Sequence, residues 1–338
     1  MKKLISLICV LAMVLALAAC GSSAPAAATE APAASTEAPA EDVSADKTFV
    51  VGICQLVQHP ARDAATQGFK DALTEALGDK VTFQEQNASG DSATCSLICN
   101  QFVSDEVDLI MANATASIQA AASATNTIPI LGTSITDYGV ALGVDNWTGV
   151  SGTNISGTSD LAPLDGQAAM IQELFPDAKT IGLLYCSGEP NSIFQADSME
   201  ALLTDMGYSV ERYTFADSND VSSVTANACS NADVLYIPTD NTAASCTEAI
   251  NNVALSAGIP IVAGEEGIAS GCGVATLSIS YYDLGHATGE MAAEILTEGA
   301  DISTMEVRFA PAFTKEYNAD ICEALNITVP EDYVAIAK

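Results

Sequence analysis

The sequence contains few basic residues and few histidines. Lysine and arginine together number 11 against 43 aspartates and glutamates, and the net charge at pH 7 is −32 over 338 residues. Proteins that bind nucleic acids need a concentration of positive charge, so this composition excludes general nucleic-acid binding. The two histidines, His59 and His286, stand in no spacing typical of a metal site. We therefore expect neither a metal nor a cofactor.

Catalytic motifs are also missing. No Gly-x-Ser-x-Gly sequence is present, and neither histidine has a nucleophile in a recognisable sequence context. A triad can be assembled from residues that are distant in sequence, so an exported hydrolase stays open as an alternative. These absences favour a binding protein over an enzyme.

The first 20 residues have the order of a bacterial export signal. Two lysines precede an apolar run from Leu4 to Ala19, and small residues lead to Cys20. The run is too short for a comfortable membrane-spanning helix, and we expect residues 1–19 to be a signal peptide. A cysteine directly after the cleavage site is typical of the bacterial lipobox, in which that cysteine receives diacylglycerol. An ordinary signal peptide with an incidental cysteine is the alternative.

Residues 20–46 are almost wholly Ala, Pro, Ser, Thr and Glu. Such a segment has little apolar surface to bury and is expected to stay extended and solvated. We therefore expect a tether that starts at the lipidated Cys20. The folded part would begin near Lys47 and work outside the cytoplasm, anchored to the cell membrane by the lipid.

Eight further cysteines belong to the expected folded part. Several lie in apolar runs, where a free thiol packs as a small hydrophobic side chain. Two of them are spaced as on one helix face, and no zinc pattern appears. The state of these thiols stays open. The eight are Cys54, Cys95, Cys99, Cys186, Cys229, Cys246, Cys272 and Cys322.

From Thr48 the chain alternates short β-branched runs with longer helical patterns, and the series occurs twice. This alternation predicts parallel sheets covered by helices on both faces, and two series predict two similar lobes. The first half has expected strands at 48–54, 81–86, 107–111 and 128–131, and expected helices at 61–77, 92–103 and 116–124. The second half has expected strands at 180–185, 208–215, 234–237 and 259–262, and expected helices at 192–206, 221–229 and 243–257.

A helical pattern at 284–296 and a strand-like segment at 307–309 follow the second half. We therefore expect the chain to cross between the lobes three times, near 159–161, 280–283 and 302–305. The expected fold class is α/β, with two doubly wound parallel-sheet lobes joined by three hinge crossings and a ligand cleft between them. The N-terminal lobe would comprise 47–160 and 282–303, and the C-terminal lobe 161–281 and 304–338.

The loops after the strands are the candidate binding sites, because ligands of open parallel sheets bind beyond the carboxyl ends of the strands. Polar residues there also cap helices, and capping is the alternative for each. None of Arg62, Arg212 and Arg308 lies in an obvious cleft loop, which argues against an arginine clamp on phosphate or sulfate. The candidate ligand-binding residues are Gln55, Thr115, Ala116, Ser134, Asp137, Asp160, Asn191, Asp240, Asn241, Glu265, Tyr281 and Tyr282.

The charges of these loops fit the two ends of a zwitterion. Thr115 and Ala116 begin a helix in a loop without acids, where free N–H groups favour a carboxylate, and Ser134 would add a hydroxyl. An ammonium group would meet Asp160, Asp240 or Glu265. The aromatic candidates for lining a side-chain pocket are Tyr281 and Tyr282, with core packing as the alternative.

Six stretches match a known family in order and spacing, and they span about residues 48 to 335. They are Val51–Pro60 (VGICQLVQHP), Thr133–Asp137 (TSITD), Asn154–Asp160 (NISGTSD), Gly188–Asn191 (GEPN), Asp240–Thr242 (DNT) and Tyr281–Gly285 (YYDLG). With these stretches the chain resembles substrate-binding lipoproteins of ABC importers, of the periplasmic-binding-protein type. The resemblance is to the branch linked to tryptophan and tyrosine uptake.

The resemblance implies two lobes that close on one free amino acid and hand it to a membrane permease driven by a cytoplasmic ATPase. Aromatic ligands such as tryptophan, tyrosine or phenylalanine are favoured, and a monomer is expected. Two departures near the cleft bear on this specificity: Tyr138 stands where proline is expected, and Ser280 where an acid is common. Alternatives are a binder of a nucleoside, a sugar or another small polar solute, and a sensor lipoprotein that presents its ligand to a membrane kinase.

Overall fold

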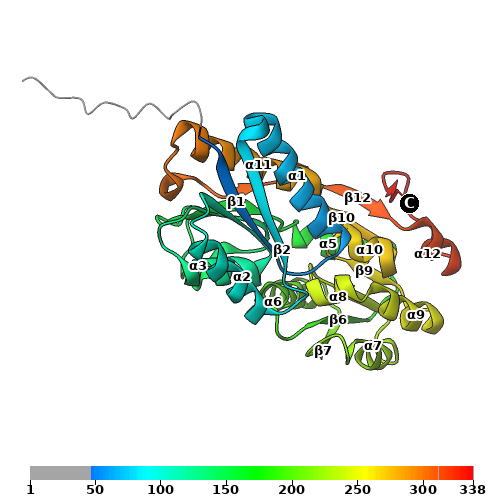
Figure 1. The fold of residues 1–338 in the computed structure, drawn as a ribbon. Coiled ribbons are helices and arrows are strands. Elements are labelled where there is room, and N and C mark those ends of the chain that lie inside the picture. Colours follow the sequence, from blue (N-terminus) through cyan, green and yellow to red (C-terminus); the bar gives the residue numbers. More distant parts are fainter. Residues whose placement is uncertain (1–46, 311, 338) are drawn as a thin grey trace, which may run out of the picture. The chain divides into compact units, whose positions relative to one another are not determined.

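Two β-sheets organise the computed structural model, which describes residues 47–310 and 312–337 (Figure 1). The predicted signal peptide (1–19), the predicted lipidation site Cys20 and the predicted tether (20–46) lie outside the described residues. No helix in the described ranges is long and apolar enough to cross a membrane.

The first sheet has six parallel strands in the order β11–β5–β4–β3–β1–β2. Every residue of β3, β4 and β5 is buried, as expected for strands with helices on both faces. The strands are β1 (Phe49–Gln55), β2 (Val81–Asn87), β3 (Leu109–Asn113), β4 (Ile130–Ile135), β5 (Ile155–Ser159) and β11 (Arg308–Phe309). The helices are α1 (Pro60–Leu77), η1 (Gly78–Lys80), α2 (Ser92–Ser104), α3 (Thr115–Ala124), α4 (Tyr138–Leu142), α11 (Tyr281–Glu298) and η2 (Ile302–Thr304).

The helices α2 and α3 pack on one face of this sheet, and α1 and α11 pack on the other (Figure 1). The backbones of α1 and α11 touch, because a Cβ atom on Gly285 would overlap the carbonyl oxygen of Ala65. Pro60 at the first position of α1 suits a helix start, since its missing N–H is not needed there. We call this sheet with its helices the first lobe.

The second sheet has the order β13–β12–β10–β9–β8–β6–β7, and its neighbours are parallel except for the antiparallel β10–β12 pair. With its helices it forms the second lobe. The strands are β6 (Thr180–Cys186), β7 (Ser209–Phe215), β8 (Val234–Ile237), β9 (Ile261–Ala263), β10 (Ala275–Ser278), β12 (Thr314–Tyr317) and β13 (Val334–Ala335). The helices are α5 (Leu164–Leu174), α6 (Pro190–Asp205), α7 (Val221–Cys229), α8 (Asn241–Ser245), α9 (Thr247–Ala257), α10 (Glu266–Cys272) and α12 (Ala319–Ala324).

The α/β class with two mainly parallel sheets is confirmed. The chain passes between the sheets after β5, after β10 and after β11. The expected third crossing at 302–305, which gave 304–338 to the C-terminal lobe, is wrong. Strand β11 pairs with β5 through Arg308 beside Thr158 and Phe309 beside Ser159, which completes the edge of the first sheet. Residues 304–309 therefore belong with the first lobe.

Candidate functional site

The candidate site lies where the carboxyl ends of the two sets of strands meet. Thr136 follows β4 and Thr239 follows β8, and their hydroxyl oxygens are 3.3 Å apart. Arg62 of α1 donates from Nε to Asn241 Oδ1 of the second lobe at 2.9 Å. All four side chains are buried. Residues of both lobes thus meet where a ligand of such sheets is expected to bind.

Arg62 is the central cation of this region. Its guanidinium lies 3.5 Å from Asp160 Oδ2, and its Cζ lies 5.7 Å from the centre of the Tyr281 ring. The Tyr281 hydroxyl donates to Asp160 Oδ2 at 3.0 Å, and Thr136 donates to Asp160 Oδ1 at 3.1 Å. Burial and then the charge of Asp160 raise the pKa of Tyr281 well above its usual range, so the phenol stays protonated.

Arg62 lies in no cleft loop, as the sequence indicated, and yet its guanidinium reaches the site. Arg62 lies in the first turn of α1 rather than in the loop before it. The first turn of a helix that follows a strand also faces the carboxyl end of the sheet. The sequence signal that would have found Arg62 is therefore an arginine in the first turn of a helix that follows a strand.

Three buried side chains of the first lobe carry polar atoms that have no hydrogen-bond partner among the described residues. These atoms are Asn113 Oδ1, Ser134 Oγ and both ring nitrogens of His59. Asn113 ends β3, and its Nδ2 donates to the Arg62 carbonyl at 2.9 Å and to Thr66 Oγ1 at 3.0 Å. Buried polar groups are nearly always paired, so unpaired ones clustered at strand ends indicate a site for a polar ligand.

The start of α3 adds N–H groups beside Ser134. Ala114, just before α3, has φ 93° and ψ 161°, a conformation that essentially only glycine adopts readily, and Ser134 has φ 57°. The Ala114 N–H donates to the Thr133 carbonyl at 3.2 Å and ties the two loops together. No side chain in the described part of the chain caps α3, so the N–H groups of Thr115 and Ala116 are available. This arrangement suits an anion.

His59 stands at the boundary of the lobes and is 5% exposed. Burial and then the charge of Arg62 lower its pKa to about 3, whereas the neighbouring Asn241 opposes the shift. The imidazole is therefore neutral at physiological pH. A neutral imidazole has one donor and one acceptor nitrogen, and His59 offers both to a ligand.

Asp240 caps α8 in the second lobe. Its Oδ1 accepts from the Ala243 N–H, and its Oδ2 accepts from the Cys186 N–H and the Ser192 hydroxyl, each at 2.7 Å. Burial and then the charge of Glu189 raise the pKa of Asp240. Both oxygens are engaged within the second lobe, as the capping alternative predicted.

Glu265 caps α10. Its oxygens accept from the Gly267 N–H at 2.7 Å and from the Ile268 N–H at 2.6 Å. Burial raises the pKa of Glu265 to about 7, although these N–H groups and Arg62 oppose the shift. Each oxygen has one hydrogen bond and therefore keeps capacity for a further donor.

The Glu189 carboxylate organises the loop between β6 and α6, and sequence reasoning gave it no role. It accepts from the N–H and Nδ2 of Asn241 at 2.9 and 2.7 Å, from the N–H and Oγ1 of Thr242 at 2.8 Å each, and from Asn191 Nδ2 at 3.1 Å. Asn191 Nδ2 also donates to the Thr239 carbonyl at 2.9 Å. The predicted residues Asn191 and Asn241 are thus brought together here.

Three predicted residues lie apart from this group or face away from it. The amide of Gln55 bonds within the first lobe to Asp63 and Thr66, at 2.7 and 2.6 Å, so it orients α1. Asp137 caps α4 and lines a separate pocket. Tyr282 is 39% exposed and donates to an aspartate of α1.

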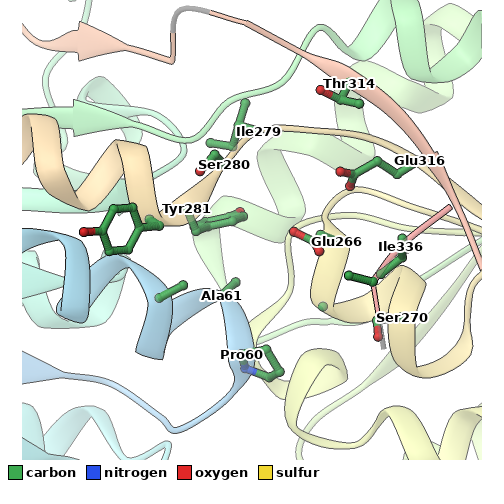
Figure 2. A pocket seen from close by; sticks show the side chains of 14 residues that line it. Pro60, Ala61, Glu266, Ser270, Ile279, Ser280, Tyr281, Thr314, Glu316 and Ile336 are labelled. Carbon is green, nitrogen blue, oxygen red and sulfur yellow. The ribbon is translucent and has the colours of Figure 1, made fainter. Parts of the chain in front are cut away.

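Two cavities flank the boundary between the lobes. One, of about 290 Å³, is lined by Ala116 of the first lobe and by Glu189 and Asn241 of the second. The other, of about 500 Å³, lies beside α1, α10, β12 and the start of α11, and Figure 2 shows Glu266 and Glu316 on its wall. The smaller cavity joins candidate residues of both lobes.

No group of three or more His, Cys, Asp and Glu side chains able to hold a metal occurs in residues 47–310 and 312–337. All eight cysteines in these ranges are free thiols, and most are buried. They pack as small hydrophobic side chains, for example Cys54, Cys95 and Cys99 in the core between the first sheet and the helices α2 and α3.

Known proteins with the same organisation include a curated relative and several solved structures. The tyrosine-binding protein of Clostridioides difficile (strain R20291) is 38% identical over 280 residues, which are 82% of this chain and 81% of the relative. The ABC domain from Streptococcus pneumonia in complex with L-Trp is 31% identical, with a TM-score of 0.80 over 84% of this chain and 97% of that one.

A second solved structure is the ligand-free, open form of a substrate-binding protein with adhesive properties from Clostridium difficile. It is 37% identical and has a TM-score of 0.66 over 86% of this chain and 99% of that one. The family model described as ABC transporter substrate binding protein matches residues 50–338. The resemblance seen in the sequence is confirmed, and the chain belongs to the family of ABC transporter substrate-binding proteins.

Proposed function

We propose that this chain captures a free aromatic amino acid between its two lobes and delivers it to an ABC permease and its ATPase. The family supplies the solute-binding component of ABC transporters, which works outside the cytoplasm and is not an enzyme. The aromatic ligand is supported by the tyrosine-binding relative and by the L-Trp held in the pneumococcal structure.

The observation that carries the proposal is the set of buried, unpaired polar atoms in the first lobe. The ligand carboxylate would accept from the Thr115 and Ala116 N–H groups and from the Ser134 hydroxyl. The ligand ammonium would donate to Asn113 Oδ1, a buried oxygen that can only accept. A free amino acid thus supplies both kinds of partner that these atoms lack.

The acid that faces the ammonium is proposed to be Glu265. Asp240 is less suited, because its oxygens hold three hydrogen bonds inside the second lobe. Asp160 is already shared by Arg62, Tyr281 and Thr136. Glu265 is 2% exposed and has one hydrogen bond at each oxygen.

The ring of Tyr281 is proposed to form one wall of the side-chain pocket. Tyr281 is 4% exposed and lies between Asp160 and the larger cavity. Its protonated hydroxyl stays bonded to Asp160, so the ring has a fixed position. An aromatic ligand could pack against such a ring in offset or edge-on contact.

We also propose that Cys20 carries a lipid, that residues 20–46 tether the folded part, and that the protein acts as a monomer. Serine cannot form the thioether, so Cys20→Ser should lose incorporation of a fatty-acid analogue. Equal label in the variant and the parent would contradict the anchor.

Thermal-shift screening of residues 47–338 against amino acids, nucleosides and sugars tests the ligand class. A ligand at 100 times its dissociation constant should stabilise the protein by about 2.7 kcal/mol. Calorimetry should then show that the N-acetyl derivative of the best amino acid does not bind, because acetylation removes the ammonium. Equal binding of the two forms, or stabilisation by nucleosides or sugars alone, would overturn the proposal.

A further inference from the structure

The two lobes of this structure are joined directly by hydrogen bonds between side chains. Arg62 Nε donates to Asn241 Oδ1 at 2.9 Å, and the hydroxyls of Thr136 and Thr239 are 3.3 Å apart. Of these residues, Arg62 and Thr136 belong to the first lobe, and Asn241 and Thr239 to the second. Both contacts form between protein groups alone.

The backbone of this protein superposes less well on the open relative than on a ligand complex. The TM-score is 0.66 with the ligand-free, open structure, which is 37% identical. It is 0.80 with the L-Trp complex, which is only 31% identical. The higher score thus belongs to the less identical chain, which is the result that a closed arrangement of the lobes would give.

The orientation of the Asn241 amide decides whether it can bond to Arg62. An amide has a donor end and an acceptor end, whereas a carboxylate only accepts. Glu189 Oε2 accepts from Asn241 Nδ2 at 2.7 Å and from the Asn241 N–H at 2.9 Å. With Nδ2 held in this way, Oδ1 is the end that faces the Arg62 guanidinium.

The first-lobe side of the contact is held by Asp160. Its Oδ2 lies 3.5 Å from the Arg62 guanidinium, and its Oδ1 accepts from Thr136 at 3.1 Å. Asp160 therefore positions both first-lobe groups that reach across to the second lobe. Arg62 is 3% exposed, and a hydrogen bond from a buried charged donor is stronger than one between neutral groups.

We propose that Arg62 and Asn241 form a latch that holds the two lobes together, and that Glu189 is the positioning residue that orients Asn241 for it. The ligand-free protein then exists as an equilibrium between latched and open forms. Only the open form admits a ligand, so the latch lowers the apparent affinity by the fraction that is latched.

The latch is tested by small-angle scattering of the ligand-free full chain carrying Cys20→Ser, so that no lipid is attached. Arg62→Lys keeps the charge beside Asp160 but removes the Nε donor. Arg212→Lys is the matched control, because Arg212 is a surface arginine paired with Asp197 and Glu200 in the second lobe. We expect Arg62→Lys to enlarge the radius of gyration, with the equilibrium shifted about tenfold or more toward the open form, and the control to match the parent.

The role of Glu189 is tested by exchanging amide and carboxylate. Glu189→Gln keeps the shape but no longer dictates the amide orientation, and it should open the lobes. The double variant Glu189→Gln with Asn241→Asp exchanges the two groups. The carboxylate at position 241 then faces Arg62, the amide at position 189 donates to that carboxylate, and the lobes should close again. A role of Glu189 in helix capping alone would not be rescued in this way.

The latch and the positioning role of Glu189 would each be contradicted by a different result. Equal radii for the parent and Arg62→Lys would show that Arg62 is no latch, and a double variant as open as Glu189→Gln would remove the positioning role. Because no ligand is added, these outcomes do not depend on which solute the protein binds. Melting of each variant by circular dichroism verifies that the fold is kept.

Discussion

The two walls of the site differ in how their polar groups are satisfied. The first-lobe wall leaves Asn113, Ser134 and His59 with buried atoms that have no partner in the described part of the chain. The second-lobe wall pairs its own groups, with Asp240 and Glu265 bonded to helix N–H groups. The first wall therefore leaves several polar atoms at the ends of its strands for a ligand. The second wall pairs the acids that follow its strands, and it leaves Glu316 Oε2 of β12 without a partner among the described residues.

This difference indicates a division of roles between the lobes. A buried polar group without a hydrogen-bond partner destabilises the protein, and a ligand that bonds to it removes this cost. Ligand contacts should therefore stabilise the first lobe most. A wall whose polar groups already have hydrogen-bond partners is held rigid by them. It gains little free energy from contacts with a ligand. We infer that the first lobe recognises the amino and carboxylate groups of the ligand and that the second lobe closes over it, with Glu265 as a partly available acid.

The largest expected effect is on the free energy of unfolding, when the carboxylate of Asp240 in the second-lobe wall is replaced. Asp240→Asn turns one acceptor oxygen into a donor that faces the Cys186 N–H or the Ser192 hydroxyl. We expect a loss of about 3 kcal/mol in the free energy of unfolding, because a buried N–H group loses its acceptor and faces another donor. Urea unfolding measures it. Ligand affinity should change little, and a large affinity loss with unchanged stability would reverse the roles of the walls.

Removing a hydroxyl from each wall sharpens the comparison. Ser134→Ala should weaken amino-acid binding by about 1.5–3 kcal/mol, because a hydrogen bond to a carboxylate is lost. Stability should not fall, since the hydroxyl has no hydrogen-bond partner among residues 47–310 and 312–337. The matched control is Ser192→Ala, whose hydroxyl donates to Asp240 at 2.7 Å, and which should lose stability but keep affinity. Calorimetry measures the affinity of both variants and urea unfolding their stability. Together they show which wall contributes to binding and which to stability.

The repeated strand and helix patterns were sufficient to predict the two sheets. The expected strand at 180–185 is β6 at Thr180–Cys186, and the expected helix at 61–77 is α1 at Pro60–Leu77. Buried strands and long helices carry strong periodic patterns. The expected helix at 243–257 is divided at Cys246, whose φ of −121° interrupts α8 and α9. The antiparallel β12 was missed because its four residues, Thr314–Tyr317, are short and polar and show no alternation of buried and exposed positions.

The site was less predictable because its contacts join distant parts of the chain. Asp160 meets Arg62 and Tyr281, which lie 98 and 121 residues away in sequence. Helix-start chemistry was enough to select Thr115 and Ala116 as candidates. Asp240 and Glu265 were selected for their negative charge in loops after strands, and the structure uses both as caps. Loop composition does not distinguish a cap from a ligand contact, because both use the same oxygen atoms.

A smaller effect is expected in the pH dependence of stability. Burial raises the pKa of Glu265 to about 7 from an ordinary 4.5. Between these pH values the folded protein holds a proton that the unfolded chain releases, so stability falls as pH rises through this window. Glutamine does not titrate, so the stability of Glu265→Gln relative to the parent should rise by about 2.5 kcal/mol between pH 5 and pH 8.

Urea unfolding of the parent and Glu265→Gln at pH 5 and pH 8 measures this difference, with Glu266→Gln as the neighbouring control. Parallel pH curves for the parent and Glu265→Gln would show that Glu265 is ionised in the folded protein. In that case the second wall would carry an uncompensated charge, and its difference from the first wall would be smaller than the structure indicates.

The smallest effect concerns backbone strain in the first wall. Ala114 has φ 93° and ψ 161°, which costs a residue with a Cβ atom about 1–3 kcal/mol. Ala114→Gly relieves this strain but gives the unfolded chain more freedom, which offsets about 0.5–1 kcal/mol. We expect a net gain of about 1 kcal/mol or less in urea unfolding and unchanged affinity, because the side chain is absent from the proposed contacts. If Ala114→Gly raises stability and lowers affinity, then the methyl group of Ala114 orders the α3 N–H groups for the ligand. The backbone strain in the first-lobe wall would then contribute to ligand binding.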